Sequence, residues 1–244
     1  MSTNKGNIIL LRATRDFNAG FGLIRSRTPD LEEFLAALHP VERNVFDCLP
    51  TAVRKDSYLL GRVAAKMAIS MIVESEAMPS VYIDQGIFMF PVVKSHLNHS
   101  IQVSISHCND IAIGLAFPEE HPLSVDIERI RPDIIEITRE YFSTADQKLL
   151  ENCRLSDPAG HTLLWTVKES LTKILRTGLT MDLTSVEIQS IEKKGDNCFI
   201  SIYRNHLQYQ AISFLKADYI CSITLPRNTN AVWVDFKAAI NSLW

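Results

Sequence analysis

The 244-residue chain lacks the features that mark several large protein classes. Lysine and arginine (25) do not outnumber aspartate and glutamate (28), and the net charge of −3 indicates no basic surface for nucleic acid. No apolar run reaches the roughly 20 residues that a membrane-spanning helix needs. The five cysteines are scattered and form no CxxC pair, which argues against a disulfide framework. There is no P-loop or GxGxxG motif for a nucleotide.

What remains is typical of a globular protein, with 46% hydrophobic and 22% charged residues. The first residues, MSTNKGNIILLRATRD, contain too short an apolar stretch for a signal peptide. An odd number of dispersed cysteines is typical of reduced thiols. We therefore expect a cytoplasmic protein.

Acidic and apolar side chains alternate in the segment LSVDIE (123–128). Period two predicts a strand with Val125 and Ile127 on one face and Asp126 and Glu128 on the other. The two carboxylates would then lie roughly 7 Å apart, which suits a shared hard cation such as Mg²⁺. A solvated strand face gives the same pattern, so the hexapeptide alone leaves both interpretations open.

The segment LLWTVKESLTK (163–173) has helical spacing. An apolar stripe runs along it through Leu164, Val167 and Leu171 and continues beyond it to Ile174 and Leu175. Glu169 and Lys173 lie four residues apart on the opposite side. They would form an ordinary surface ion pair, or they would face a cleft in which Glu169 supplies a third carboxylate.

Together these segments resemble the 4′-phosphopantetheinyl transferases of the large, surfactin-synthetase-activating type. The matching motifs, in chain order, are VSISH (103–107), VDIE (125–128), YFSTAD (141–146) and WTVKESLTK (165–173). Four departures stand out. Ser124 replaces the usual Gly, Asp146 replaces the usual Glu, and GIFMFPVV (86–93) stands where the family has a Gly-Lys-Pro element. The family's early basic positions match only loosely.

The resemblance implies an α+β fold made of two similar halves in one chain, each a short antiparallel sheet packed with helices. The turn-rich segment PEEHP (118–122) predicts the boundary between them. We expect an N-terminal half at 1–120 that binds coenzyme A and a C-terminal half at 121–244 that binds metal and docks the carrier. Because both halves of the site belong to one chain, we expect a monomer.

The implied reaction transfers 4′-phosphopantetheine from coenzyme A, the co-substrate, to a serine of an apo acyl or peptidyl carrier protein. It is Mg²⁺-dependent and releases adenosine 3′,5′-bisphosphate. By the resemblance, Asp126, Glu128 and Glu169 are the metal ligands, and Lys173 and His107 assist at the phosphates. The serine proton would go to Glu169 or to a water held by Glu128, and the sequence leaves that choice open.

A helix predicted over 54–74 carries four cations: Arg54, Lys55, Arg62 and Lys66. A charged outer face is the simple explanation of such a pattern. The resemblance instead implies that Arg54 and Lys55, together with Ser106 and His107, bind the phosphates of coenzyme A. Lys168 is a minor candidate for a phosphate contact. Glu42 and Arg43 are expected on a solvated helix face.

Arg129 and Arg131 directly follow the VDIE strand, so the carrier protein is expected to dock beside them. Alternatively, they only pair with Asp133 and Glu136. A further alternative is a catalytically inactive homologue that binds coenzyme A or a carrier. The surfactin-type resemblance suggests secondary-metabolite biosynthesis, but the sequence identifies no particular carrier protein.

Overall fold

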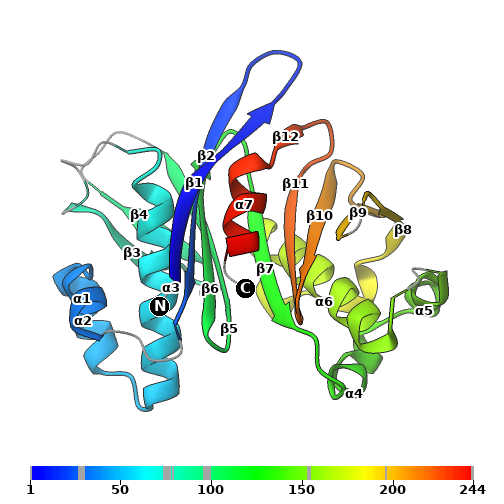
Figure 1. Cartoon of the computed structure of the whole chain (residues 1–244), viewed down its shortest axis with the longest axis horizontal. Helices are drawn as coiled ribbons and strands as arrows, with labels where there is room; N and C mark the ends of the chain where they lie inside the picture. Colours follow the sequence, from blue (N-terminus) through cyan, green and yellow to red (C-terminus); the bar gives the residue numbers. More distant parts are fainter. Residues whose placement is uncertain are drawn as a thin grey trace. The chain divides into compact units, whose positions relative to one another are not determined.

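The structure, a computed structural model, describes residues 2–26, 31–73, 78, 80–95, 100–152, 155–195 and 197–242 (Figure 1). The chain divides into two compact units. The first consists of residues 1–123 and 229–244, and the second of residues 124–228. Each has a five-stranded antiparallel sheet and one long helix, which confirms the predicted α+β class. Within the described ranges, no helix is long and apolar enough to cross a membrane.

The five-stranded sheet of the first unit has the strand order β12-β1-β2-β6-β5. Strands β3 and β4 form a separate two-stranded sheet. The strands are β1 (Ser2–Leu11), β2 (Phe17–Arg25), β3 (Tyr82–Gln85), β4 (Pro91–Lys94), β5 (Ile101–Cys108), β6 (Ile111–Pro118) and β12 (Asn230–Val232). The helices are α1 (Leu31–Ala36), α2 (Pro40–Asp47), α3 (Ala52–Ile69) and α7 (Val234–Ser242). The hairpin predicted over 101–117 is therefore present as β5 and β6.

Helix α3 lies directly on this sheet because the strands beneath it carry glycine. A Cβ atom added at Gly22 would come within 2.2 Å of the carbonyl oxygen of Ala64. One added at Gly114 would come within 2.5 Å of the backbone of Ala65. Small residues on both surfaces thus hold the helix backbone against the sheet, and this contact fixes the position of the cations that α3 carries.

A buried ion pair joins α2 to α3, contrary to the expectation that Glu42 is solvated. Lys66 Nζ lies 2.8 Å from Glu42 Oε2, and both side chains are buried. Glu42 also accepts hydrogen bonds from the backbone N–H groups of His39 and Ile83, both at 2.9 Å. The expectation was right only for Arg43, which is exposed and pairs with Asp47.

The second unit has the strand order β7-β11-β10-β9-β8. Its strands are β7 (Ser124–Arg129), β8 (Ile188–Lys193), β9 (Cys198–Tyr203), β10 (Tyr209–Lys216) and β11 (Tyr219–Pro226). Its helical segments are α4 (Ile134–Thr138), η2 (Arg139–Tyr141), α5 (Thr144–Asn152), α6 (Asp157–Ile174), η3 (Gly178–Thr180) and η4 (Leu183–Ser185). Helix α6 packs on β7, β11 and β10 (Figure 1).

The unit boundary differs from the predicted halves at the C-terminus. The chain passes from the first unit to the second between residues 123 and 124, three residues after the predicted boundary at 120. Residues 229–244, however, return to the first unit, because β12 pairs with β1 through Ile9 and Val232. Long-range strand pairing of this kind leaves no local signal in the sequence.

Candidate functional site

Strand β7 presents its polar side chains to helix α6. Ser124 donates a hydrogen bond from Oγ to the carbonyl oxygen of Ser170, and Asp126 bonds to Lys173. Because side chains alternate along a strand, Glu128 lies on this same face, with Val125 and Ile127 on the other. The alternation predicted from the sequence is therefore present, with its polar residues under a helix rather than in bulk water.

Lys173 neutralises Asp126. Its Nζ lies 2.6 Å from Asp126 Oδ1 and also donates to the carbonyl oxygen of Val125 at 3.1 Å. Asp126 is 2% exposed, whereas the Lys173 side chain is about one quarter exposed. Lys173 thus reaches from solvent into a buried carboxylate, and it is not the surface partner of Glu169 that i,i+4 spacing alone suggests.

Glu169 is the most perturbed carboxylate of the site. Its pKa is raised to about 7, first by burial and then by the negative charges of Asp126 and Glu128, while Lys173 opposes the shift. The electrostatic coupling shows that the three predicted carboxylates are gathered in one region of the second unit. A carboxyl group with such a pKa exchanges its proton near neutral pH.

The donor set suits a hard divalent cation, because three carboxylates that repel one another gain most from a shared positive charge. As the side chains stand, however, no three His, Cys, Asp or Glu groups in the described part of the chain form a metal-ligand cluster. Lys173 occupies the position of a cation beside Asp126. The chemistry of the donors therefore fits, and their present arrangement is that of an ion pair.

The side chain of Lys168 is fully buried, which does not suit the phosphate contact considered for it. Its ammonium group lies 2.7 Å from Asp146 Oδ2 and donates to the carbonyl oxygens of Tyr141 and Leu183. Asp146 in turn accepts a hydrogen bond from the backbone N–H of Ser143, at the start of α5. Lys168 and Asp146, from two separate motifs, thus join α6 to α5 and do not face the site.

The first unit contains a cavity of about 400 Å³. Its walls come from α3, the β3–β4 hairpin and β5, and they bring together Arg54, Arg62 and His107. Met89 and Pro91, from the segment that replaces the Gly-Lys-Pro element, also line it. The other lining residues are Leu49, Val53, Ser57, Tyr58, Gly61, Gln85 and Ile105. Three cationic or protonatable groups beside apolar walls make this a candidate site for an anionic ligand.

Arg62 is the best-defined cation of the cavity. It is only 8% exposed, and its guanidinium lies over the ring of Tyr58, 4.6 Å from the ring centroid. Within the described residues its Nε atom has no hydrogen-bond partner. A buried guanidinium N–H without a partner costs free energy, which an anion in the cavity would recover.

The other predicted phosphate-binding residues are placed differently. Lys55 is not part of the cavity lining, and its Nζ lies over the ring of Phe46 at 5.3 Å from the centroid. Ser106 is buried, and alternation along β5 places its side chain on the opposite face from Ile105 and His107, which both line the cavity. Of the four predicted residues, the structure therefore brings Arg54 and His107 to the cavity.

Sequence reasoning missed Arg62 and Tyr58 as residues of the cavity. The available signal was helical spacing. Arg54, Tyr58 and Arg62 follow one another at intervals of four, which places them on one face of α3. The equal spacing of Lys66 shows the limit of that signal, because Lys66 points to Glu42 instead.

The raised pKa of Glu169 predicts a pH-dependent loss of stability. Between about 4.5 and about 7, the folded protein holds a proton on Glu169 that the unfolded chain has already released. The free energy of unfolding must therefore fall as pH rises through this range. Glu169→Gln lacks this contribution, so its stability relative to wild type should rise with pH. Urea unfolding of both proteins across the range measures the difference.

Glu192→Gln provides the matched control, because Glu192 is an exposed glutamate of the same unit, paired with Lys194. Its stability difference from wild type should stay nearly constant with pH. A Glu169→Gln difference that is equally constant would contradict the assigned pKa.

Comparison with known proteins agrees with the geometry of the second unit. The family model of the 4′-phosphopantetheinyl transferase superfamily matches residues 122–224. A curated 4′-phosphopantetheinyl transferase, psf-1 of Bacillus pumilus, is 30% identical over 87 residues, which are 35% of this chain and 36% of that protein. The match thus spans about a third of the relative's length.

Among solved structures, a holo-(acyl-carrier-protein) synthase from Bacillus anthracis str. Ames, in complex with CoA, is similar at 21% sequence identity and a TM-score of 0.37. The similarity covers 45% of this chain and 96% of that chain. The family model and the curated relative confirm the resemblance inferred from the motifs. Over residues 122–224, the chain is thus similar to the 4′-phosphopantetheinyl transferase superfamily.

Proposed function

We propose that the protein transfers 4′-phosphopantetheine from coenzyme A to a serine hydroxyl of an apo carrier protein. The observation that carries the proposal is the gathering of Asp126, Glu128, Glu169 and Lys173 by one strand and one helix of the second unit. In the reaction the serine oxygen bonds to the β-phosphorus of the pyrophosphate. The bond to the bridging oxygen breaks, and adenosine 3′,5′-bisphosphate leaves.

The residues of the second unit have separate roles in this proposal. Glu169 in its ionised form, or a water held by Glu128, accepts the serine proton. Lys173, part exposed and flexible, stabilises the negative charge on a phosphate oxygen. Its release from Asp126 leaves that carboxylate able to take another cation.

Asp126, Glu128 and Glu169 would hold a Mg²⁺ ion, for which their oxygen donors are suited. When bound, the ion neutralises the diphosphate and orients the displacement. The Lys173–Asp126 contact must open for this to happen, because Lys173 neutralises Asp126 in the structure.

The cavity of the first unit supports a site for the 3′-phosphate of coenzyme A. Arg54, Arg62 and His107 supply the donors, and the Nε atom of Arg62 lacks a partner among the described residues. Lys55 and Ser106 remain weaker candidates because neither lines the cavity. One chain thus carries groups for the nucleotide and groups for the chemistry, which supports activity as a monomer.

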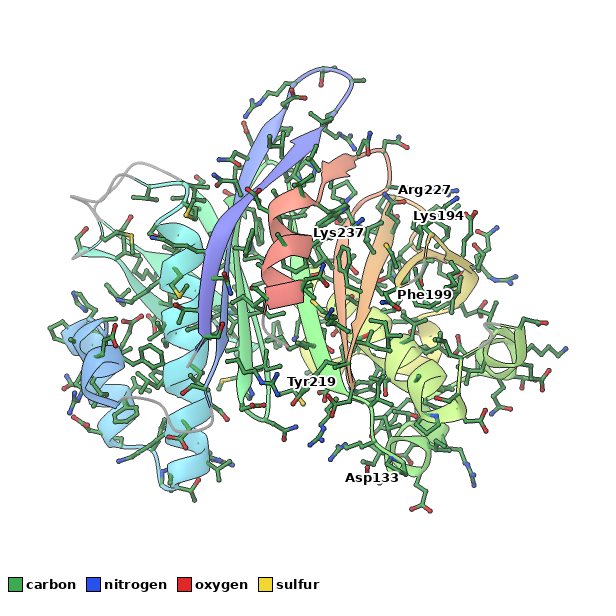
Figure 2. All side chains as sticks on the ribbon, viewed as in Figure 1. Asp133, Lys194, Phe199, Tyr219, Arg227 and Lys237 are labelled. Atoms are coloured by element: carbon green, nitrogen blue, oxygen red, sulfur yellow. The ribbon has the colours of Figure 1, made fainter. Side chains whose placement is uncertain are left out.

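The carrier protein is proposed to dock beside Arg129 and Arg131, at the end of β7. The side chains of both arginines are about half exposed. Arg129 lies 2.6 Å from Asp218, and Arg131 lies 3.5 Å from Asp133, which Figure 2 labels beside α4. The anticipated pairing with Asp133 is present, so docking of an acidic carrier helix would compete with intramolecular ion pairs. Such contacts affect encounter rate more than affinity.

The transferase proposal is tested by incubating the protein with coenzyme A, Mg²⁺ and several apo carrier proteins, followed by intact-mass measurement. At least one carrier should gain the mass of phosphopantetheine. Coenzyme A binding by calorimetry without any mass gain would favour the second candidate, a catalytically inactive binding homologue.

Asp126→Ala should abolish turnover while the protein stays folded, because it removes a predicted metal ligand and the partner of Lys173. Calorimetric titration with Mg²⁺ should show loss of binding in the variant. Glu192→Ala, which removes an exposed carboxylate of the same unit away from the proposed docking surface, is the control and should behave as wild type. Full activity in Asp126→Ala, or in excess EDTA, would refute the metal assignment.

Arg62→Met should weaken coenzyme A binding by about tenfold or more, the effect of losing a hydrogen bond to a charged group. Binding of 3′-dephospho-coenzyme A should change little, since that ligand lacks the phosphate assigned to Arg62. Arg54→Ala should act in the same direction. Lys55→Ala removes an equal charge outside the cavity and serves as the comparison. Equal effects of Arg62→Met on both ligands would place the 3′-phosphate elsewhere.

Reversing both charges, with Arg129→Glu and Arg131→Glu, should lower kcat/KM for the carrier and weaken its salt dependence, because the steering charges are lost. Coenzyme A binding by calorimetry should not change. Arg204→Glu, an exposed arginine paired with Glu187 in the same unit, is the matched control. A similar loss in Arg204→Glu would indicate a nonspecific charge effect rather than a docking surface.

A further inference from the structure

The interface between α6 and its sheet is built from hydroxyl groups. Thr166 Oγ1 and Ser222 Oγ lie 2.7 Å apart, as do Ser213 Oγ and Ser222 Oγ. Nearer the carboxylates, Ser170 Oγ lies 2.7 Å from Thr224 Oγ1. All these side chains are buried. The helix is thus held by directional bonds, which fix its rotation and its position along the sheet more narrowly than apolar contacts do.

Ser170, the neighbour of Glu169, is held at two points. Its carbonyl oxygen accepts the hydrogen bond from Ser124 Oγ at 2.5 Å, and its hydroxyl meets Thr224. Thr224 Oγ1 lies 2.7 Å from the hydroxyl of Tyr203, which donates to the carbonyl oxygen of Val167 at 2.8 Å. Strands β7, β11 and β9 therefore all contact the same turn of α6.

The start of β7 is joined to the end of α6 by charged and by neutral hydrogen bonds. The charged ones run from the ammonium group of Lys173 to Val125 and Asp126. The neutral one runs from the hydroxyl of Ser124 to the carbonyl oxygen of Ser170. In the proposed reaction Lys173 moves to a phosphate, so its bonds do not last through turnover. The bond from Ser124 involves no charged group and can stay intact while the ions rearrange.

We propose that Ser124 is a positioning residue, whose hydroxyl keeps Glu169 and Lys173 in register with Asp126 during the reaction. This role rests on the proposed transferase function. Displacing a reacting group by about 1 Å can lower a rate by up to roughly a hundredfold, so a single neutral hydrogen bond at this place can affect turnover. Ser124 does not line the cavity of the first unit, where coenzyme A is proposed to bind.

The test compares Ser124→Ala with Ser213→Ala. Both remove one hydroxyl that is fully buried in the same unit, but Ser213 bonds to Ser222 on the neighbouring strand and not to α6. For Ser124→Ala we expect kcat to fall about tenfold with KM for coenzyme A unchanged, because ground-state binding is kept. Ser213→Ala should leave both constants near wild type.

Hydrogen–deuterium exchange gives a second measurement that does not depend on activity. Amides of residues 171–175 should exchange faster in Ser124→Ala than in Ser213→Ala, because the last turn of α6 loses its tie to β7. If Ser124→Ala does not fold, Ser124→Cys gives the same comparison, since a thiol is a weak donor. Equal kcat and equal exchange in the two variants would overturn the proposal. If wild type transfers nothing, the proposed function fails, and the exchange comparison still decides whether Ser124 holds α6.

Discussion

The position of α6 on its sheet is the constraint on which the candidate chemistry depends. Glu169 and Lys173 belong to this helix, whereas Asp126 and Glu128 belong to the strand below it. Neither element brings the four groups together alone. Their interface is polar because β7 turns Ser124 and Asp126 toward the helix, and every hydroxyl there must find a partner once it is buried. The requirement for satisfied hydrogen bonds and the requirement for aligned carboxylates are met by the same contacts.

The sequence predicted the carboxylates because their arrangement is local. Alternation along six residues places Asp126 and Glu128 on one face, and helical spacing relates Glu169 to Lys173. The sequence could not predict which polar side chains form ion pairs or hydrogen bonds with one another. Lys173 pairs with Asp126 rather than Glu169, and Lys168 is buried against Asp146, because those distances depend on how distant segments pack. Glu42 shows the same limit, since only the folding of β3 beside α2 makes it a buried acceptor.

The two units place a helix on a sheet in different ways. In the first, glycine and alanine let backbones approach, as at Gly22 and Ala64, and no hydroxyl chain is needed for the contact. In the second, serine, threonine and tyrosine hold the helix through hydrogen bonds. The first arrangement gives a rigid support for Arg62, which we propose binds a phosphate. The second gives a precise support for Glu169 and Lys173, which would change partners in the proposed reaction.

The pairing of β1 with β12 has a consequence for the biosynthesis of the protein. Ile9 pairs with Val232, so the first sheet lacks its edge strand until residues 230–232 have been translated. Residues 124–228, by contrast, form an uninterrupted unit that can fold as soon as it leaves the ribosome. The second unit can therefore be complete before the first unit gains its edge strand. The cavity lined by Arg54 and Arg62 thus belongs to the unit that is completed last.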